Sequence, residues 1–146
     1  MTRVLGVDLG TVRIGIALSD PTGAVAAPLE TIIHRERQKD LAAVAALAQT
    51  HGAARIVVGW PRNMDGTSGP AARRAEAFAA SLRQIVNVPV DLWDERLSTA
   101  AAERTLRDAS VRRARRRAVR DRVAAALILQ AYLSARSRTT NSTGRG

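Results

Sequence analysis

The sequence predicts an α/β domain built on a mixed five-stranded sheet flanked by helices. Three observations predict this class: a length of 146 residues that suits one domain, three strand-like segments at the start of the chain, and an alternation of helices and strands after them. Apolar residues make up 46% of the chain and charged residues 25%, as in ordinary globular proteins, so wholesale disorder is excluded. We expect one domain over residues 1–135 and a flexible tail over residues 136–146.

The first third of the chain predicts three antiparallel strands in succession. Residues 3–8 and 13–19 are largely apolar, and Gly10 lies in the short turn between them. In the second segment bulky and small residues alternate, so this strand should have one bulky face and one small face. The third strand, residues 28–33, begins at a proline, which places it at an edge of the sheet.

Helices and strands alternate through the middle of the chain. Apolar residues recur at helical spacing over residues 38–51, and residues 55–60 form a β-branched run that ends before Pro61. A second helix should begin at Pro70, and residues 88–93 should form the fifth strand. Strands joined through helices pair in parallel, so the last two strands should run parallel to the first. The buried stripe of the second helix is expected to consist of Ala75, Phe78, Leu82 and Ile85.

The last third of the chain predicts two helices. Ser98 or Thr99 is expected to cap a helix that runs to about Leu106, and residues 120–135 form a long alanine-rich helix. Residues 134–146 have no periodic pattern. Ligand sites in open α/β sheets lie at the carboxyl ends of the strands, so a site is expected there.

The net charge of +10 is concentrated near the C-terminus, where residues 112–146 hold 10 of the 23 basic residues and a single acid. Lysine occurs only at Lys39, and the planar fork of arginine suits phosphate oxygens. Such a cluster either forms a solvated face or binds a polyanion, and its self-repulsion favours nucleic acid as the partner. Aromatic residues make up only 3% of the chain, which argues against a stacking platform for single strands. The arginines expected to hold phosphates are Arg13, Arg96, Arg112, Arg113, Arg115, Arg116, Arg117, Arg120 and Arg122.

Several residue types are scarce or absent. The chain has no cysteine, which excludes disulfides, thiolate nucleophiles and cysteine zinc sites. The two histidines, His34 and His51, are expected in surface or capping roles, so a serine–histidine–aspartate triad is not supported. No segment is long and apolar enough to be a signal peptide or a membrane span, and we expect a cytoplasmic protein without membrane association.

Acidic residues occupy three unexpected places. Asp8 ends an otherwise apolar strand, Glu95 follows the fifth strand, and Asp121 is the only acid among the C-terminal arginines. Each has an ordinary alternative role. Asp8 can form a turn, and Glu95 can lie in an exposed loop bonded to Arg96. Asp121 can stabilise the helix dipole or form an ion pair with Arg117 one helical turn away. The strand ends and the helix start would nevertheless bring the three acids together.

A site of three carboxylates without histidine or cysteine has only hard oxygen ligands, which select Mg²⁺ or Mn²⁺. Two such ions can activate a water and stabilise the leaving oxygen of a phosphodiester. With Asp8, Glu95 and Asp121 as ligands, the sequence therefore predicts a metal-dependent nuclease that uses water as its nucleophile.

Four separated motifs carry a resemblance to a known family. They are residues 7–15 (VDLGTVRIG), residues 59–67 (GWPRNMDGT), residues 94–99 (DERLST) and the helix that follows Asp121. In this order, from about residue 3 to residue 135, they resemble the YqgF family of pre-16S rRNA nucleases, also called Holliday-junction-resolvase-like proteins.

The resemblance implies a ribonuclease H-like fold, a bacterial cytoplasmic protein and a role in maturing the 5′ end of 16S rRNA. It also implies that Asp8, Glu95 and Asp121 are the acidic metal ligands. The chain departs from the family where Trp60 replaces a small aliphatic residue and where arginine replaces lysine before Asp121. The loop residues Asn63, Asp65 and Thr67 are expected either to contact substrate or to form a tight turn.

Three functions remain after these observations. The leading one is an endonuclease of structured RNA, with precursor rRNA or a ribosomal subunit precursor as its partner. A resolvase of four-way DNA junctions would use the same carboxylates in a dimer, and the sequence leaves monomer and homodimer open. The third is a nucleic-acid-binding module without catalysis, whereas an actin-like ATPase is disfavoured because that fold needs two such domains.

Overall fold

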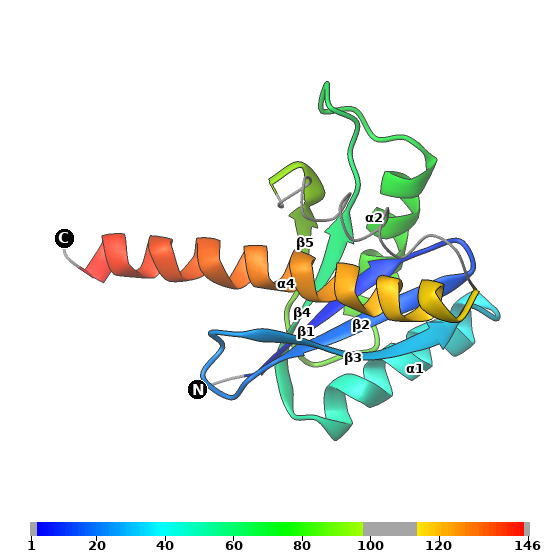
Figure 1. The fold of residues 1–146 in the computed structure, drawn as a ribbon, viewed down its shortest axis with the longest axis horizontal. Coiled ribbons are helices and arrows are strands. Elements are labelled where there is room, and N and C mark those ends of the chain that lie inside the picture. The colour runs from blue at the N-terminus through cyan, green and yellow to red at the C-terminus, as the bar shows by residue number, and fades with distance from the viewer. Residues whose placement is uncertain (1–2, 98–113, 145–146) are drawn as a thin grey trace.

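The computed structural model describes residues 3–97 and 114–144, and within the last helix it describes the side chains of residues 121–137 (Figure 1). No helix among these residues has the length and apolar character needed to cross a membrane. The elements in chain order are β1 (Arg3–Leu9), β2 (Arg13–Ser19), β3 (Ala26–Ile33), α1 (Arg37–Thr50), β4 (Ala53–Trp60), α2 (Pro70–Arg83), β5 (Val90–Asp94), the short 3-10 helix η1 (Glu95–Leu97) and α4 (Ala114–Gly144).

The five strands form one mixed sheet in the order β3-β2-β1-β4-β5. β2 is antiparallel to both β1 and β3, whereas β4 is parallel to both β1 and β5. These directions, and the edge position of β3, confirm the prediction from the sequence. Because β1, β4 and β5 run in the same direction, their carboxyl ends meet at one edge of the sheet.

Different helices cover the two faces of this sheet. α1 and α2 pack on one face, and α4 crosses the other (Figure 1). In β1, Leu5 and Val7 are fully buried in the core beneath α1 and α2, whereas Val4 belongs to a second core beneath α4. Successive side chains of a strand point to opposite faces, so Gly6 and Asp8 lie on the α4 face.

Two glycines let α4 lie very close to the sheet. A Cβ atom at Gly6 would lie 2.9 Å from the Cβ of Leu129, and one at Gly15 would lie 2.0 Å from the backbone oxygen of Asp121. Neither distance is sterically allowed, so the approach of the helix requires glycine at these two positions. The small face predicted for the second strand is therefore the face over which α4 passes.

Gln130 fixes the position of α4 along the sheet. Its side-chain Oε1 accepts a hydrogen bond of 2.9 Å from the backbone N–H of Ala26, and its Nε2 donates one of 3.0 Å to the backbone oxygen of Ala24. Ala26 is the first residue of β3, and Ala24 lies just before the strand. The helix is thus held at this end by a bidentate amide and near Asp121 by close packing on Gly15.

The end of α2 differs from the prediction. The helix ends at Arg83, and the backbone N–H groups of Ile85 and Val86 both donate to the carbonyl of Leu82 as the chain turns. As a result Ile85, expected in the buried stripe, is 54% exposed, and Val86 packs against the core in its place.

The last helix is longer than predicted. α4 continues to Gly144, so residues 136–144 are helical rather than an irregular tail. The segment contains no proline, and extending an existing helix needs no new nucleation, which explains how serine, threonine and asparagine residues remain helical. The boundary of the domain at residue 135 stays a prediction, and the helix predicted from Ser98 or Thr99 lies outside the described residues.

Candidate active site

The site predicted from the sequence lies at the edge where β1, β4 and β5 end. Asp8 in β1 is paired directly with Gly15 in β2. On its other side, Val7 pairs with Val58, so the next residues, Asp8 and Gly59, follow side by side. Asp8 therefore stands between two glycines on the α4 face of the sheet, with no side chain beside it on either neighbouring strand.

The two glycine positions are covered by the other two predicted acids. The backbone of Asp121 lies over Gly15, as its 2.0 Å distance from a Cβ at that position shows. The side chain of Glu95 lies over Gly59, where a Cβ atom would come within 2.7 Å of its Oε2. We call Asp8, Glu95 and Asp121 the acidic row. The structure thus places all three residues around the same short stretch of the sheet edge.

All three members of the acidic row are half-buried, and each takes part in at least one hydrogen bond or electrostatic interaction. Within the described part of the chain, no three histidine or carboxylate side chains are gathered closely enough to be identified as a metal site by geometry. Coordination of a metal by Asp8, Glu95 and Asp121 therefore stays a prediction, supported by their placement at one edge.

Asp94, which ends β5, has a structural role beside the acidic row. Its carboxylate accepts hydrogen bonds from the backbone N–H of Arg96 at 3.0 Å and from the Nη2 of the same residue at 2.6 Å. Arg62 adds a longer contact of 3.4 Å from its Nη1. The Arg96 guanidinium lowers the pKa of the Asp94 carboxyl, and Asp94 in turn raises the pKa of Arg96. Asp94 is therefore an anion tied to arginine.

This pairing decides the direction of Glu95. An aspartate that accepts a hydrogen bond from the N–H two residues later starts a helical turn, and the 3-10 helix η1 begins at Glu95. The turn carries the Glu95 side chain over Gly59. In the same turn, the Arg96 guanidinium bonds to Asp94, with its Nε at 3.0 Å from Oδ1 and its Nη2 at 2.6 Å from Oδ2.

The loop of residues 61–69 is closed by its own polar groups. The Nδ2 of Asn63 donates to the Oγ1 of Thr67 at 2.9 Å, and that hydroxyl donates to Asp65 at 2.6 Å. The hydrogen bonds from Thr67 lower the pKa of Asp65. Gly66 adopts a φ of +89°, which other residues rarely reach. Asn63, Asp65 and Thr67 thus form the tight turn expected as one alternative, and their contact with substrate stays a prediction.

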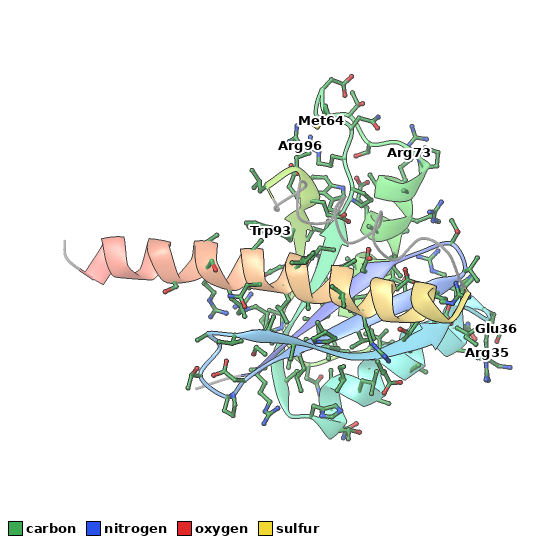
Figure 2. The ribbon with its side chains drawn as sticks, viewed as in Figure 1. Arg35, Glu36, Met64, Arg73, Trp93 and Arg96 are labelled. Carbon is green, nitrogen blue, oxygen red and sulfur yellow. The ribbon has the colours of Figure 1, made fainter. Side chains whose placement is uncertain are left out.

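A second set of contacts fastens this loop to the body of the protein. The Arg62 guanidinium lies 4.4 Å from the centre of the Trp60 ring, and the indole N–H of Trp60 donates to Glu76 at 2.8 Å. Arg96 reaches the loop from η1 and donates to the carbonyl of Met64 at 3.3 Å (Figure 2). Neither Arg62 nor Glu76 was predicted from the sequence as a site residue. Trp60 could have indicated an acidic partner such as Glu76, because its indole N–H needs a hydrogen-bond acceptor.

The arginines predicted to hold phosphates are only partly within the described residues. Arg13 and Arg122 are half-buried, at the start of β2 and next to Asp121 respectively. The Arg96 guanidinium is occupied by Asp94 and Met64, which leaves it less available to phosphate than expected. Arg112 and Arg113 lie outside the described residues. For Arg115, Arg116, Arg117 and Arg120, the structure describes only the backbone, which forms the first turns of α4 and leads directly to Asp121.

Comparison with protein families gives a match over nearly the whole chain. Residues 2–135 match the RuvX family, described as Holliday junction resolvase. A protein of Symbiobacterium thermophilum named "Putative pre-16S rRNA nuclease" is 52% identical over 135 residues, which cover 92% of this chain and 94% of the relative. Proteins with the same name are 52% identical in Geobacillus kaustophilus, covering 92% of this chain and 99% of the relative, and 50% identical in Myxococcus xanthus, covering 91% and 88%.

Solved resolvase structures have a similar fold at low sequence identity. The Thermus thermophilus RuvC structure in complex with a Holliday junction substrate superposes with a TM-score of 0.58 at 16% identity, covering 92% of this chain and 96% of that one. The fowlpox virus resolvase, solved with Holliday junction DNA, gives 0.51 at 11% identity, covering 91% and 97%. The chain therefore belongs to the RuvX family, the YqgF family whose motifs it carries, and it has the ribonuclease H-like fold.

Proposed function

We propose that this protein is a divalent-metal-dependent endonuclease that cleaves phosphodiester bonds of structured RNA, at the 5′ end of precursor 16S rRNA, in the cytoplasm. The observation that carries the proposal is the acidic row, in which Asp8 stands between two glycines covered by Glu95 and Asp121. The names of relatives that are about half identical over nearly their full length support the choice of substrate.

The donor set of the acidic row fits Mg²⁺ or Mn²⁺. All three side chains offer carboxylate oxygens, the ligands that these hard cations prefer. Gly15 and Gly59 leave the space beside Asp8 unfilled by side chains of their own. Bound to Asp8, Glu95 and Asp121, one or two such ions would supply an activated water and stabilise the leaving oxygen of the phosphodiester.

The remaining residues of the site hold and position the substrate. Arg115, Arg116, Arg117 and Arg120 share one helix with Asp121, so a phosphate backbone bound along the start of α4 would lead toward the acidic row. Asp94 and Arg96 set the direction of Glu95 and hold the loop of residues 61–69 beside it. The protein would act on precursor rRNA or a ribosomal subunit precursor as a monomer or a homodimer.

A four-way DNA junction is the second candidate substrate. The matching family is described as Holliday junction resolvase, and a similar fold is found in a RuvC structure that contains a Holliday junction. Symmetrical cutting of such a junction needs two active sites, so this function would require a dimer.

The deciding experiment incubates the purified protein with a 5′-extended 16S precursor RNA and with a four-way DNA junction, in Mn²⁺, Mg²⁺ or EDTA. We expect metal-dependent cutting of the RNA that falls at least about a thousandfold in Asp8→Asn, since the variant removes a ligand worth several kcal/mol of transition-state stabilisation. Glu30→Gln, an exposed change on the edge strand β3, is the control and should cut like the wild type.

The other outcomes separate the alternatives. Cutting of the DNA junction alone would establish the resolvase instead. Salt-sensitive binding of both substrates without any metal-dependent product would establish a binding module, and full activity of Asp8→Asn would exclude the acidic row as the catalytic site.

A further inference from the structure

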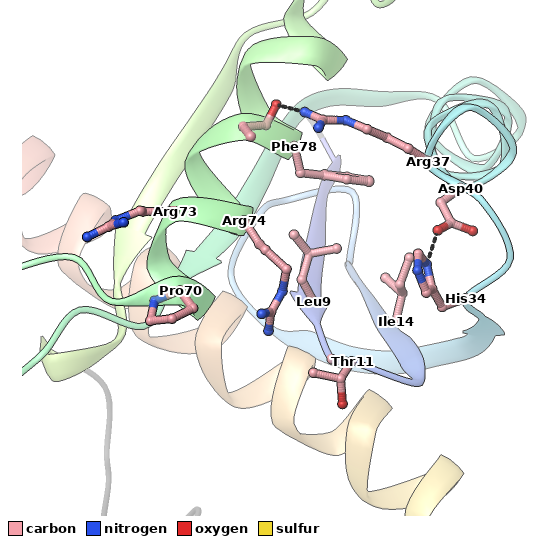
Figure 3. A pocket seen from close by; sticks show the side chains of 12 residues that line it. Leu9, Thr11, Ile14, His34, Arg37, Asp40, Pro70, Arg73, Arg74 and Phe78 are labelled. Carbon is pink, nitrogen blue, oxygen red and sulfur yellow. Dashed lines mark hydrogen bonds and ion pairs between the residues drawn. The ribbon is translucent and has the colours of Figure 1, made fainter.

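A cavity of about 420 Å³ lies behind the turn that joins β1 to β2, on the face of the sheet covered by α1 and α2 (Figure 3). We call it the turn cavity. It belongs to the opposite face from the acidic row, although both lie at the same end of β1. Its lining residues include Leu9, Thr11, His34, Arg37, Arg74 and Phe78.

One side of the turn cavity is apolar. Leu9, Ile14 and Phe78 line it, and the last two are 1% and 6% exposed, so they are firmly packed parts of the core. A cavity of several hundred Å³ with an apolar wall suits an organic group such as a nucleobase or a sugar. A bare inorganic ion would leave this wall without a partner.

The other walls are positively charged. Arg37, Arg73 and Arg74 line the cavity, and the carboxylate among its described lining residues is Asp40. Asp40 is only 2% exposed, and its carboxylate is already used by the Nδ1 of His34 and by the backbone N–H of Arg35 at 3.2 Å. Arg73 points away from the cavity and donates from its Nε to the carbonyl of Ser68 at 3.1 Å, so the arginine charge that faces the cavity comes from Arg37 and Arg74 (Figure 3).

Arg74 is the cation best placed to receive a ligand. Its guanidinium makes no hydrogen bond or ion pair within the part of the chain that the structure describes, and it extends from α2 toward Thr11 (Figure 3). Arg37 on the other side is held in place instead, because its Nη2 donates to the carbonyl of Ala77 at 2.8 Å and to the hydroxyl of Ser81 at 2.9 Å.

Two helices add positive potential. α1 begins at Arg37 and α2 at Pro70, and both residues line the cavity. Neither N-cap residue, Glu36 or Gly69, caps its helix with a side-chain hydrogen bond. The start of a helix carries partial positive charge, which favours a phosphate and adds to the charge of the arginines at this cavity.

We propose that the turn cavity binds a nucleotide, with its base or sugar against Leu9 and Phe78 and its phosphate near Arg74. The nucleotide is either a free one or an unpaired nucleotide of a nucleic-acid strand. This inference goes beyond the proposed function, since it requires none of the three carboxylates. Leu9 directly follows Asp8 in β1. A nucleic-acid strand bound at the acidic row would therefore reach the turn cavity by passing over the edge of the sheet.

Binding tests the proposal separately from cleavage. The full chain is titrated in EDTA with uridine 5′-monophosphate and with a short 5′-phosphorylated single-stranded RNA, by calorimetry or NMR. Arg74→Ala should weaken binding about tenfold or more, as loss of a charge-assisted hydrogen bond does. Arg35→Ala, which removes the same charge from an exposed residue outside the cavity, should stay within about twofold of wild type.

Ala77→Leu provides a second test without a change of charge. Ala77 lines the cavity, so a larger side chain there should fill part of it and weaken binding of the nucleotide. Circular dichroism and thermal unfolding establish that each variant is folded. Arg74-dependent binding of the monophosphate identifies a free nucleotide as a ligand, and Arg74-dependent binding of the RNA alone identifies the strand. Equal losses in Arg74→Ala and Arg35→Ala, unchanged affinity in Ala77→Leu, or no binding of either probe by the wild type would overturn the proposal.

Discussion

The sheet carries large aliphatic side chains on the face beneath α1 and α2, whereas on the face beneath α4 glycines and an aspartate stand among fewer apolar residues, such as Val4 and Val57. Leu5 and Val7 of β1 are fully buried on the first face, and Gly6 and Asp8 alternate with them on the second. The first arrangement removes much apolar area from water. The second lets a helix backbone approach the strands closely enough to bring an acidic residue to a strand end. In β1, the side chains beneath α1 and α2 thus stabilise the fold, and those beneath α4 belong to the candidate site.

The largest effect in this comparison is expected from Leu5→Ala. Leu5 is fully buried beneath α1 and α2, so the change leaves a cavity and should lower the free energy of unfolding by about 2–5 kcal/mol. Below the melting temperature, cleavage per folded molecule should stay near that of the wild type. Urea unfolding together with the RNA cleavage assay measures both. A loss of cleavage in fully folded Leu5→Ala would show that the two faces are not independent.

Gly15→Ala should affect both properties. Its Cβ would collide with the backbone of α4 at Asp121, and such overpacking costs about 1–3 kcal/mol of stability. Because Asp121 must move with the helix, cleavage should fall as well. Gly52→Ala is the matched control: its φ of +64° makes alanine unfavourable by about 1 kcal/mol, yet nothing lies within 4 Å and cleavage should not change. Equal cleavage by the two variants would contradict the close packing of α4.

Gly59→Ala should lower cleavage more than stability. The new Cβ would meet the ends of two side chains, the Oε2 of Glu95 at 2.7 Å and the Cδ1 of Ile128 at 2.9 Å, and these can move aside. Displacement of Glu95 should slow cleavage about tenfold, equivalent to about 1.4 kcal/mol in the barrier. Thermal unfolding and cleavage rates compared with those of Gly15→Ala test this difference. A stability loss as large as that of Gly15→Ala would count against it.

The smallest effect is expected from Asp94→Asn, and it depends on pH. Hydrogen bonds from Arg96 lower the pKa of the Asp94 carboxyl, so this carboxylate stabilises the folded state. The stabilisation, about 1 kcal/mol, is complete above the pKa of the unfolded chain near 4 and is lost as the pH falls through the lower pKa of the folded state. Urea unfolding of both proteins between pH 7 and pH 3 should show their difference shrinking in acid. A difference that grows as the pH falls would contradict the pairing with Arg96.

The parts of the molecule that depend on local patterns could be predicted from the sequence. Largely apolar runs on either side of a turn glycine identified β1 and β2, and the small face predicted for β2 is the one beneath α4. Asp8 was recognisable as a functional candidate because a carboxylate at the end of an apolar strand is costly without a partner. The placement of Glu95 near Asp8 followed from the parallel pairing of β4 with β1 and β5.

Contacts between distant segments could not be predicted in this way. The Trp60 indole bonds to Glu76 only because α2 presents that residue to the end of β4, and no local pattern reveals the rotation of a helix about its axis. Arg96 binds Asp94 because the chain turns into η1 directly after β5. Ile85 kept the spacing of the buried stripe, but the helix had already ended at Arg83.

The two hydrogen bonds of Gln130 make the position of Asp121 depend on the length of α4 between these two residues. Gln130 is fixed at the start of β3, and Asp121 lies nine residues before it along the same helix, a length of roughly 13.5 Å at about 1.5 Å per residue. Substitutions between these two residues leave that length unchanged. Inserting or deleting one residue would instead move Asp121 by about 1.5 Å and turn it by about 100° around the helix axis, away from Asp8. The segment from 122 to 129 should therefore tolerate changes of composition far better than changes of length.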